Sequence, residues 1–167
     1  MSATRPTRPI YVAVCGPGVA TDQEEVWAEE VGRLLAREGA VVVCGGMTGV
    51  MDSVARGATG EGGVSIGLLP TPGRTGASVH LTYSIPTGLA EARNVLVARA
   101  ADVLIAISGE FGTLSEIAFA LKIGVPVVGL STWDLHRRGE PVSAYPTAST
   151  PAEAVAEALR LARQAGT

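Results

Sequence analysis

The sequence contains little lysine, and this shortage disfavours two classes of enzyme. Only one of the 13 basic side chains, Lys122, is a lysine, and it falls late in a predicted helix. A Walker-type phosphate loop needs a lysine directly after its glycines, and a pyridoxal enzyme needs a lysine for its Schiff base. Both chemistries are therefore disfavoured.

Cysteine and histidine are also scarce, with two of each. The two cysteines, Cys15 and Cys44, and the two histidines, His80 and His136, lie far apart in the chain. Zinc and iron–sulfur sites need such residues at short, regular spacings, so we expect no metal site. Each cysteine ends a predicted strand, and we interpret both as small buried core residues without a disulfide.

Charged residues make up only 17% of the chain, and the net charge is −3. No excess of positive charge attracts nucleic acid or an anionic membrane surface. No apolar run approaches the roughly 20 residues that cross a bilayer. We therefore expect a cytoplasmic protein with neither nucleic acid nor membrane as a partner.

Apolar side chains are abundant, at 47% of the 167 residues. They suffice for one sizeable core, and the length favours a single domain over two. Residues 1–9 are polar with two prolines, and we expect them to form a disordered tail. Residues 10–167 then form the domain.

Short runs rich in β-branched residues alternate with segments of helical period along the chain. This alternation predicts an α/β fold, a single doubly wound Rossmann-like domain with a mostly parallel sheet and helices on both faces. The predicted strands are 10–15, 40–44, 64–69, 79–83, 103–107 and 125–130, the predicted helices 22–38, 48–60, 87–100, 112–123 and 151–164, and the predicted loops 70–78 and 131–149.

Glycine-rich turns follow three of the predicted strands. The carboxyl ends of parallel strands share one edge of the sheet, so these turns converge there. Glycine lets main-chain N–H groups approach an anion, and the next helix N-terminus adds a favourable dipole. The turns predict a phosphate cradle, although tight turns also need glycine for conformation alone. They are 15–18, 44–49 and 108–113.

A dinucleotide site is disfavoured by two absences. The turn from Gly16 to Thr21 lacks the third glycine of the dinucleotide fingerprint. The acidic residue that holds the ribose at the end of the second strand is also missing, because Cys44 and Gly45 stand there. We therefore expect no NAD and no other resident cofactor.

Three motifs together resemble the LOG family over about residues 10–130. They are Gly45-Gly46-Met47-Thr48-Gly49-Val50-Met51, then Arg93-Asn94, then Gly109-Glu110-Phe111-Gly112-Thr113-Leu114-Ser115-Glu116. Members of that family, once mislabelled lysine decarboxylases, hydrolyse nucleoside 5′-monophosphates such as cytokinin ribotides to free base and ribose 5-phosphate. The scarcity of lysine independently disfavours the older label.

The resemblance implies roles for individual residues. Arg93 matches the family's catalytic arginine and Glu116 its catalytic glutamate. A fixed carboxylate suits the cleavage of an N-glycosidic bond, because positive charge develops on the ribose in the transition state. The residues expected to bind phosphate or nucleotide are Gly16, Gly45, Gly46, Thr48, Gly49, Asn94, Gly109, Gly112 and Thr113.

Departures from the family pattern keep a second function open. Ser108 replaces a proline, Glu110 replaces a glycine, and Glu91-Ala92-Arg93-Asn94 replaces His-Glu-Arg-Lys. In these respects the sequence is similar to a divergent branch, that of the molybdenum cofactor carrier protein, whose ligand is a phosphate-bearing pterin. The alternatives are thus a phosphoribohydrolase acting on nucleoside monophosphates and a non-catalytic carrier or nucleotide-sensing protein that binds a small phosphorylated ligand.

The two key residues also have structural interpretations. Glu116 could close a capping box with Thr113, and Arg93 could form an ion pair at the surface or at an interface.

The predicted helices 87–100 and 112–123 are apolar around much of their circumference. A second subunit would cover them, so we expect a homodimer or homotetramer.

Overall fold

A computed structural model describes residues 8–165 of the chain. The predicted disordered tail therefore lies almost wholly outside the described residues. The elements follow one another as β1 (Tyr11–Cys15), α1 (Asp22–Arg37), β2 (Val41–Cys44), α2 (Val50–Gly60), β3 (Val64–Leu69), β4 (Tyr83–Pro86), the 3-10 helix η1 (Ala90–Arg93), α3 (Asn94–Arg99), β5 (Val103–Ile107), α4 (Phe111–Ile123), β6 (Val127–Leu130), β7 (His136–Arg137), β8 (Glu140–Pro141), β9 (Thr147–Ala148) and α5 (Pro151–Ala165).

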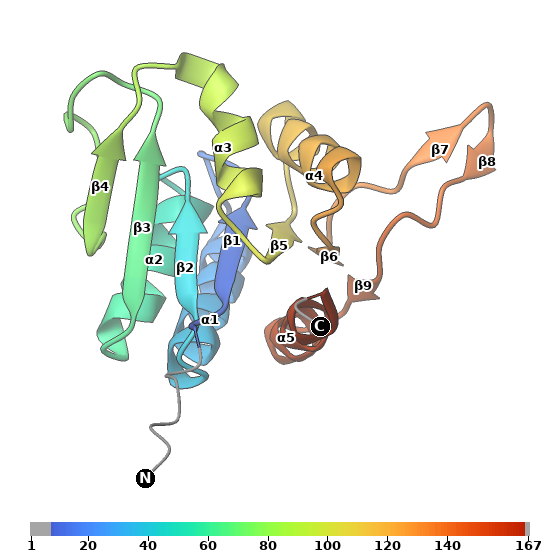
Figure 1. The fold of residues 1–167 in the computed structure, drawn as a ribbon, viewed down its shortest axis with the longest axis horizontal. Coiled ribbons are helices and arrows are strands. Elements are labelled where there is room, and N and C mark those ends of the chain that lie inside the picture. Colours follow the sequence, from blue (N-terminus) through green and yellow to red (C-terminus); the bar gives the residue numbers. More distant parts are fainter. Residues whose placement is uncertain (1–7, 166–167) are drawn as a thin grey trace, which may run out of the picture.

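A seven-stranded sheet in the order β4-β3-β2-β1-β5-β6-β9 runs through the molecule (Figure 1). Every strand in it pairs in parallel with its neighbours. The strand order reverses between β1 and β5, so the chain winds outward from the centre in both directions. This is the predicted doubly wound Rossmann-like fold, and ligands bind such sheets at the reversal.

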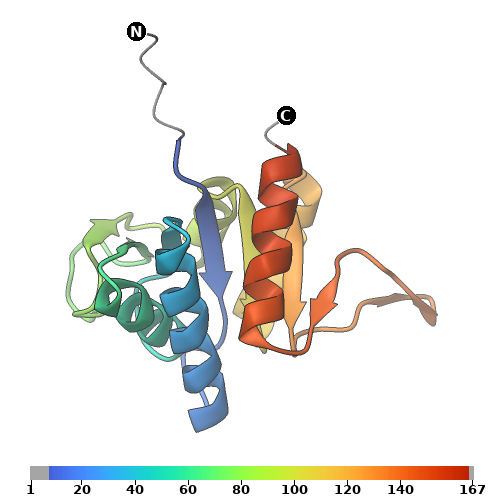
Figure 2. The ribbon, with the colours of Figure 1, turned by 90° about the horizontal axis from the view of Figure 1, so that it is seen from below.

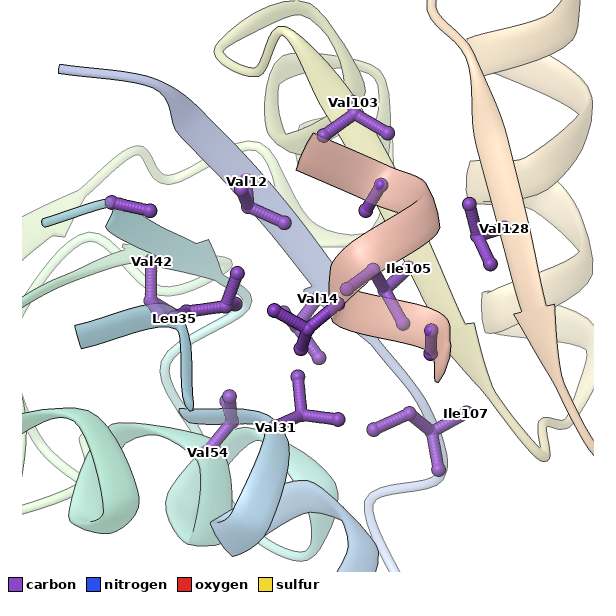
Figure 3. Close-up of a cluster of buried hydrophobic side chains, with 14 of the residues drawn as sticks. Val12, Val14, Val31, Leu35, Val42, Val54, Val103, Ile105, Ile107 and Val128 are labelled. Carbon is purple, nitrogen blue, oxygen red and sulfur yellow. The ribbon is translucent and has the colours of Figure 1, made fainter. Parts of the chain in front are cut away.

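Helices cover both faces of the sheet (Figures 1 and 2). Successive strand residues point to opposite faces. On β1, Val12 and Val14 join the core beneath α1, α2 and α5, which Figure 3 shows in close-up. Ala13 and Cys15 join the second core, beneath α3 and α4. Burial on both faces explains the continuous apolar runs in the sequence. Among the described residues, no helix is long and apolar enough to cross a membrane.

Two helices begin at the predicted caps. Thr21 Oγ1 accepts a hydrogen bond from the Glu24 amide at 3.3 Å, and Glu24 Oε2 accepts one from the Thr21 amide at 2.8 Å, which completes the capping box of α1. Thr150 Oγ1 accepts from the Glu153 amide at 3.2 Å, at the start of α5. These side chains satisfy amides that no helical carbonyl reaches.

Three predicted segments are corrected by the structure, the first being the strand at 79–83. The strand β4 begins only at Tyr83, and Val79 is 89% exposed. The connection after β3 instead bonds back to the turn after β2, where the Ser78 amide donates to the Gly46 carbonyl at 2.9 Å. This tertiary contact overrides the β-propensity of the segment.

The predicted helix at 87–100 is shorter than expected. Gly88 and Ala90 have φ angles of 66° and 47°, and left-handed backbone interrupts a right-handed helix. Only η1 and α3 remain helical. The predicted loop at 131–149 contains three short strands: β7 and β8 form an antiparallel ribbon that projects from the body, and β9 extends the sheet beyond β6 (Figure 1).

Helices α3 and α4 leave part of their side of the sheet open. Leu68 of β3 packs against the core beneath them, and it pairs in register with Ile85 of β4. Ile85 and Tyr83 on this face are 47% and 59% exposed. The described part of the chain places no helix over them (Figure 1).

Helices α1 and α2 lie so close at Gly57 that no side chain fits between them. A Cβ on Gly57 would lie 2.0 Å from the Glu29 carbonyl oxygen. Replacement Gly57→Ala should therefore lower the free energy of unfolding, measured by urea denaturation, by about 1–3 kcal/mol. The control is Gly60→Ala, whose Cβ meets nothing within 4 Å; it should be neutral or slightly stabilising. Equal losses in both variants would contradict this packing.

Candidate functional site

A cavity of about 250 Å³ opens at the carboxyl edge of the sheet, where the strand order reverses. Its walls come from the turns after β1, β2 and β3, from α2, from η1 and the start of α3, and from the first turns of α4. The lining residues are Cys15, Gly16, Pro17, Gly18, Gly45, Met51, Pro70, Ala90, Glu91, Arg93, Asn94, Glu110, Gly112, Thr113 and Glu116. The three glycine turns thus converge as the sequence predicts.

Contacts between the first two turns fix the shape of this edge. Thr48 Oγ1 donates to the Gly18 carbonyl at 2.8 Å. Gly49, with φ 63°, precedes α2, and a Cβ there would lie 2.4 Å from the Pro17 carbonyl oxygen. Glycine is needed at position 49 for both its conformation and this close approach.

The structure brings most of the expected site residues together. Arg93 and Glu116 line the cavity, as do five of the expected binding residues, Gly16, Gly45, Asn94, Gly112 and Thr113. The other four, Gly46, Thr48, Gly49 and Gly109, do not line it. They shape the turns instead: Gly109 has φ 133°, and a Cβ there would lie 2.7 Å from the Thr113 side chain. A direct part for any of these residues in ligand binding stays a prediction.

Arg93 and Glu116 form the floor of the cavity. They are only 8% and 6% exposed, and Arg93 Nη1 lies 3.8 Å from Glu116 Oε1. The interpretation of Arg93 as a surface residue is therefore wrong. So is the capping-box interpretation of Glu116, because α4 begins at Phe111 and places Glu116 in its second turn.

The Arg93 guanidinium packs against Gly45, which has no side chain to exclude it. A Cβ on Gly45 would lie 2.4 Å and 2.6 Å from the two terminal nitrogens of the guanidinium. The guanidinium therefore occupies the space that a side chain at position 45 would take. Replacing Gly45 would push the guanidinium aside.

The guanidinium of Arg93 retains unused donor capacity. Among the described residues its buried Nε has no hydrogen-bond partner, and 3.8 Å to Glu116 is longer than a hydrogen bond. Buried donors are nearly always paired, and an unpaired one is unfavourable. These unused donors would suit an anionic ligand.

The carboxyl group of Glu116 has an altered acidity. Burial raises its pKa to about 7, although the nearby Arg93 guanidinium and the Cys15 thiol both act to lower it. Burial also raises the pKa of the Cys15 thiol, and the Glu116 carboxylate adds to this effect. A protonated, 2%-exposed thiol is a poor nucleophile.

The sequence analysis did not predict several residues that line the cavity. Cys15 was expected only in the core, yet as the last residue of β1 it also faces the cavity. Pro70 and Ala90 come from segments expected to be a loop and a helix, and the Ala90 amide donates to the Pro70 carbonyl at 2.9 Å. Adjacency to the glycine turns could have indicated Cys15. No local signal indicated the other two.

Asn94 connects the two helices beside the cavity. Its Nδ2 donates to Ser115 Oγ at 2.9 Å, and Ser115 Oγ donates to the Gly112 carbonyl at 2.6 Å. This chain of hydrogen bonds fixes α3 against the first turn of α4. Among residues 8–165, no group of three or more histidine, cysteine or acidic side chains could hold a metal ion.

A Rossmann-like domain with a charged cavity at the strand reversal defines a class of small-ligand site. The chain belongs to the SLOG cluster4 family, whose model matches residues 9–159. The resemblance to LOG-like proteins expected from the motifs is thereby confirmed.

Three relatives show how far this similarity extends. An uncharacterized protein of Archaeoglobus fulgidus is 37% identical over 121 residues, which cover 72% of this chain and 80% of that protein. The solved structure of the molybdenum cofactor binding protein from Rippkaea orientalis has a TM-score of 0.82 and 33% identity, covering 96% of this chain and 99% of that one. The Moco carrier protein from Chlamydomonas reinhardtii has a TM-score of 0.81 and 32% identity, covering 94% and 99%.

The raised pKa of Glu116 predicts a pH dependence of stability. The folded protein keeps a proton that the unfolded chain releases above its ordinary pKa of 4.5. This contribution is fully present below pH 4.5 and is lost as the pH rises to about 7. Replacement Glu116→Gln should avoid the loss, so its free energy of unfolding should rise relative to the wild type by up to about 3 kcal/mol between pH 4.5 and 8.

Urea denaturation at several pH values measures this difference. The matched control is Glu110→Gln, because Glu110 is exposed. Its difference from the wild type should not change over the same range. A Glu116→Gln variant with the same pH dependence as the wild type would contradict the raised pKa.

Proposed function

We propose that this protein binds a phosphorylated pterin of the molybdenum cofactor type and carries it without cleaving it. The observation that carries the proposal is the buried Arg93 guanidinium at the cavity floor, whose Nε donor has no partner among the described residues. A phosphate in the cavity would supply acceptors for the terminal nitrogens of this guanidinium, which donate no hydrogen bond to any described residue. Arginine suits this role because its planar, permanently charged fork matches phosphate oxygens.

The start of α4 offers a second contact for the same anion. The side chain of Glu110, which precedes the helix, makes no capping hydrogen bond, and Gly112 and Thr113 line the cavity. The first amides of this 13-residue helix therefore remain available. Helix N-termini bind phosphate through such amides and through the helix dipole.

The two structural relatives support a carrier over an enzyme. Both are described by their binding or carriage of the molybdenum cofactor, and both match this chain over nearly its whole length.

The proposal predicts that the protein retains molybdenum cofactor during anaerobic gel filtration. The Arg93→Met variant should retain about tenfold less, because it loses a charge-assisted contact with the phosphate. Gly45→Ala should show the same loss, because it displaces the guanidinium. Retained cofactor is measured as its fluorescent oxidised pterin.

The matched control for this experiment is Arg99→Met. Arg99 is an exposed arginine at the end of α3 and does not line the cavity. This variant should retain as much cofactor as the wild type. A wild-type protein that retains none, or an Arg93→Met variant that retains as much, would contradict the proposal.

Hydrolysis of nucleoside 5′-monophosphates is the second candidate function. Its supporting observation is the buried pair of Arg93 and Glu116, in which the pKa of the carboxyl group is about 7. A carboxyl group with that pKa can exchange protons near neutral pH and can stabilise a positively charged ribose. Both candidates therefore use Arg93, whereas only the hydrolase uses Glu116.

Chromatographic detection of free base distinguishes a carrier from a hydrolase. The protein is incubated with AMP and with N6-isopentenyladenosine monophosphate. The carrier proposal predicts no free base above the rate without protein. Base release by the wild type that is lost in Glu116→Gln would establish the hydrolase and contradict carriage without cleavage.

We further propose that the protein is a homodimer or homotetramer through the side that bears α3 and α4. Phe119 on α4 and the open face of β4, with Tyr83 and Ile85, leave 37–59% of these large side chains exposed. A monomer would leave this apolar surface in water. A second copy would bury it.

Light scattering during size-exclusion chromatography tests the assembly. The wild type at micromolar concentration should have two or four times the 17.0 kDa mass of one chain. The double variant Tyr83→Arg/Ile85→Glu should shift toward the monomer, since charge is unfavourable at a buried apolar contact. A monomeric wild type would contradict the proposed assembly.

A further inference from the structure

Two carboxylates line the cavity and take no part in the contacts described above. Glu91 precedes Arg93 on η1, and Glu110 precedes α4; both line the cavity and both are exposed. Within residues 8–165, neither side chain has a hydrogen bond or an ion pair. Ionised carboxylates only accept hydrogen bonds. Water hydrates them in the free protein, so a ligand that displaces this water binds best when it brings N–H donors to Glu91 and Glu110.

These carboxylates oppose the anion preference of the floor. Arg93 and the α4 amides favour phosphate, whereas Glu91 and Glu110 repel it, because like charges at short range are unfavourable. A free phosphate would satisfy only one part of the cavity. A ligand with a negative end at the floor and an N–H-rich end near Glu91 and Glu110 satisfies both.

Three exposed apolar residues stand next in the chain to residues that line the cavity. Val19, Leu89 and Phe111 are 88%, 48% and 80% exposed. Each is the chain neighbour of a lining residue, namely Gly18, Ala90 or Glu110. Apolar and aromatic side chains beside a binding cavity suit the faces of a planar heterocycle. The Phe111 ring packs against that of Trp133, with the ring centroids 5.7 Å apart, so an aromatic surface follows Glu110 in the chain. A planar ring system at the N–H-rich end of the ligand would suit this surface.

We propose that Glu91 and Glu110 select a heterocycle with a 2-amino-4-oxopyrimidine edge; this inference rests on the proposed function. Such an edge places an amino N–H beside a ring N–H, and two parallel donors match the two oxygens of a carboxylate. Guanine and pterin share this edge. Adenine places a ring-nitrogen acceptor beside its amino group, and that acceptor would face a carboxylate lone pair.

Isothermal titration calorimetry of the full chain in EDTA tests the selection, with GMP, IMP, AMP and neopterin monophosphate as ligands. GMP and neopterin monophosphate should bind at least about tenfold more tightly than AMP, because hydrogen bonds to a charged group contribute strongly. IMP, which lacks the 2-amino group, should bind more weakly than GMP. Whichever of GMP and neopterin monophosphate binds with higher affinity shows whether the site prefers guanine or pterin.

Variants distinguish hydrogen bonding to the 2-amino-4-oxopyrimidine edge of the ligand from contact with the faces of its ring. Glu91→Gln and Glu110→Gln should each reduce the ratio of GMP to AMP affinity by about threefold or more. Phe111→Ala should weaken both ligands by a similar factor and keep the ratio. Glu140→Gln, an exposed residue of the projecting ribbon, is the matched control and should change nothing.

The remaining outcomes contradict the inference in distinguishable ways. Equal affinities for GMP, neopterin monophosphate and AMP would overturn the selection and leave the proposed binding of a phosphorylated ligand intact. Absence of binding by all four ligands, with or without Mg²⁺, would overturn both. Binding that requires Mg²⁺ and disappears in EDTA would mean that Glu91 and Glu110 hold a cation bridging to the phosphate, which also overturns the selection.

Discussion

The burial of one guanidinium, that of Arg93, is the constraint on which the rest of the site depends. Its terminal nitrogens lie against Gly45, where a Cβ would come within 2.4 Å. Glu116 lies opposite at 3.8 Å, and Asn94, the next residue, holds α3 to α4 through Ser115. The glycine turn, the carboxylate and the two helices are thus arranged around a single buried cation.

Such an arrangement is not explained by stability. Removing a charge pair from water is expensive, and a buried pair often stabilises no better than apolar residues would. Here the geometry is also loose, since the Arg93 Nε has no partner among the described residues and the Glu116 pKa is raised to about 7. Perturbed groups gathered in a cavity at the strand reversal are typical of functional sites. We therefore propose that the floor is an anion site rather than a structural ion pair.

Much of the fold was predictable because it depends on local patterns. The apolar runs at β1, β3 and β5, the capping box of Thr21 and Glu24, and the convergence of the glycine turns follow from periodicity, cap chemistry and parallel topology. The position of β4 and the shortening at η1 were not predictable. They depend on contacts between distant segments and on the positive φ of Ala90. The placing of Gly46, Thr48 and Gly49 outside the cavity likewise depends on how one turn packs against another.

The claim that the Arg93 guanidinium binds the ligand's phosphate can be tested most directly by NMR. The Nε–H resonances of arginine are recorded during titration with neopterin monophosphate, and that of Arg93 is assigned from the spectrum of Arg93→Lys. The account predicts that this resonance shifts in a saturable manner while that of the exposed Arg99 does not move. A saturable response elsewhere, with the Arg93 resonance unchanged, would show that the ligand binds without this guanidinium and would contradict the account.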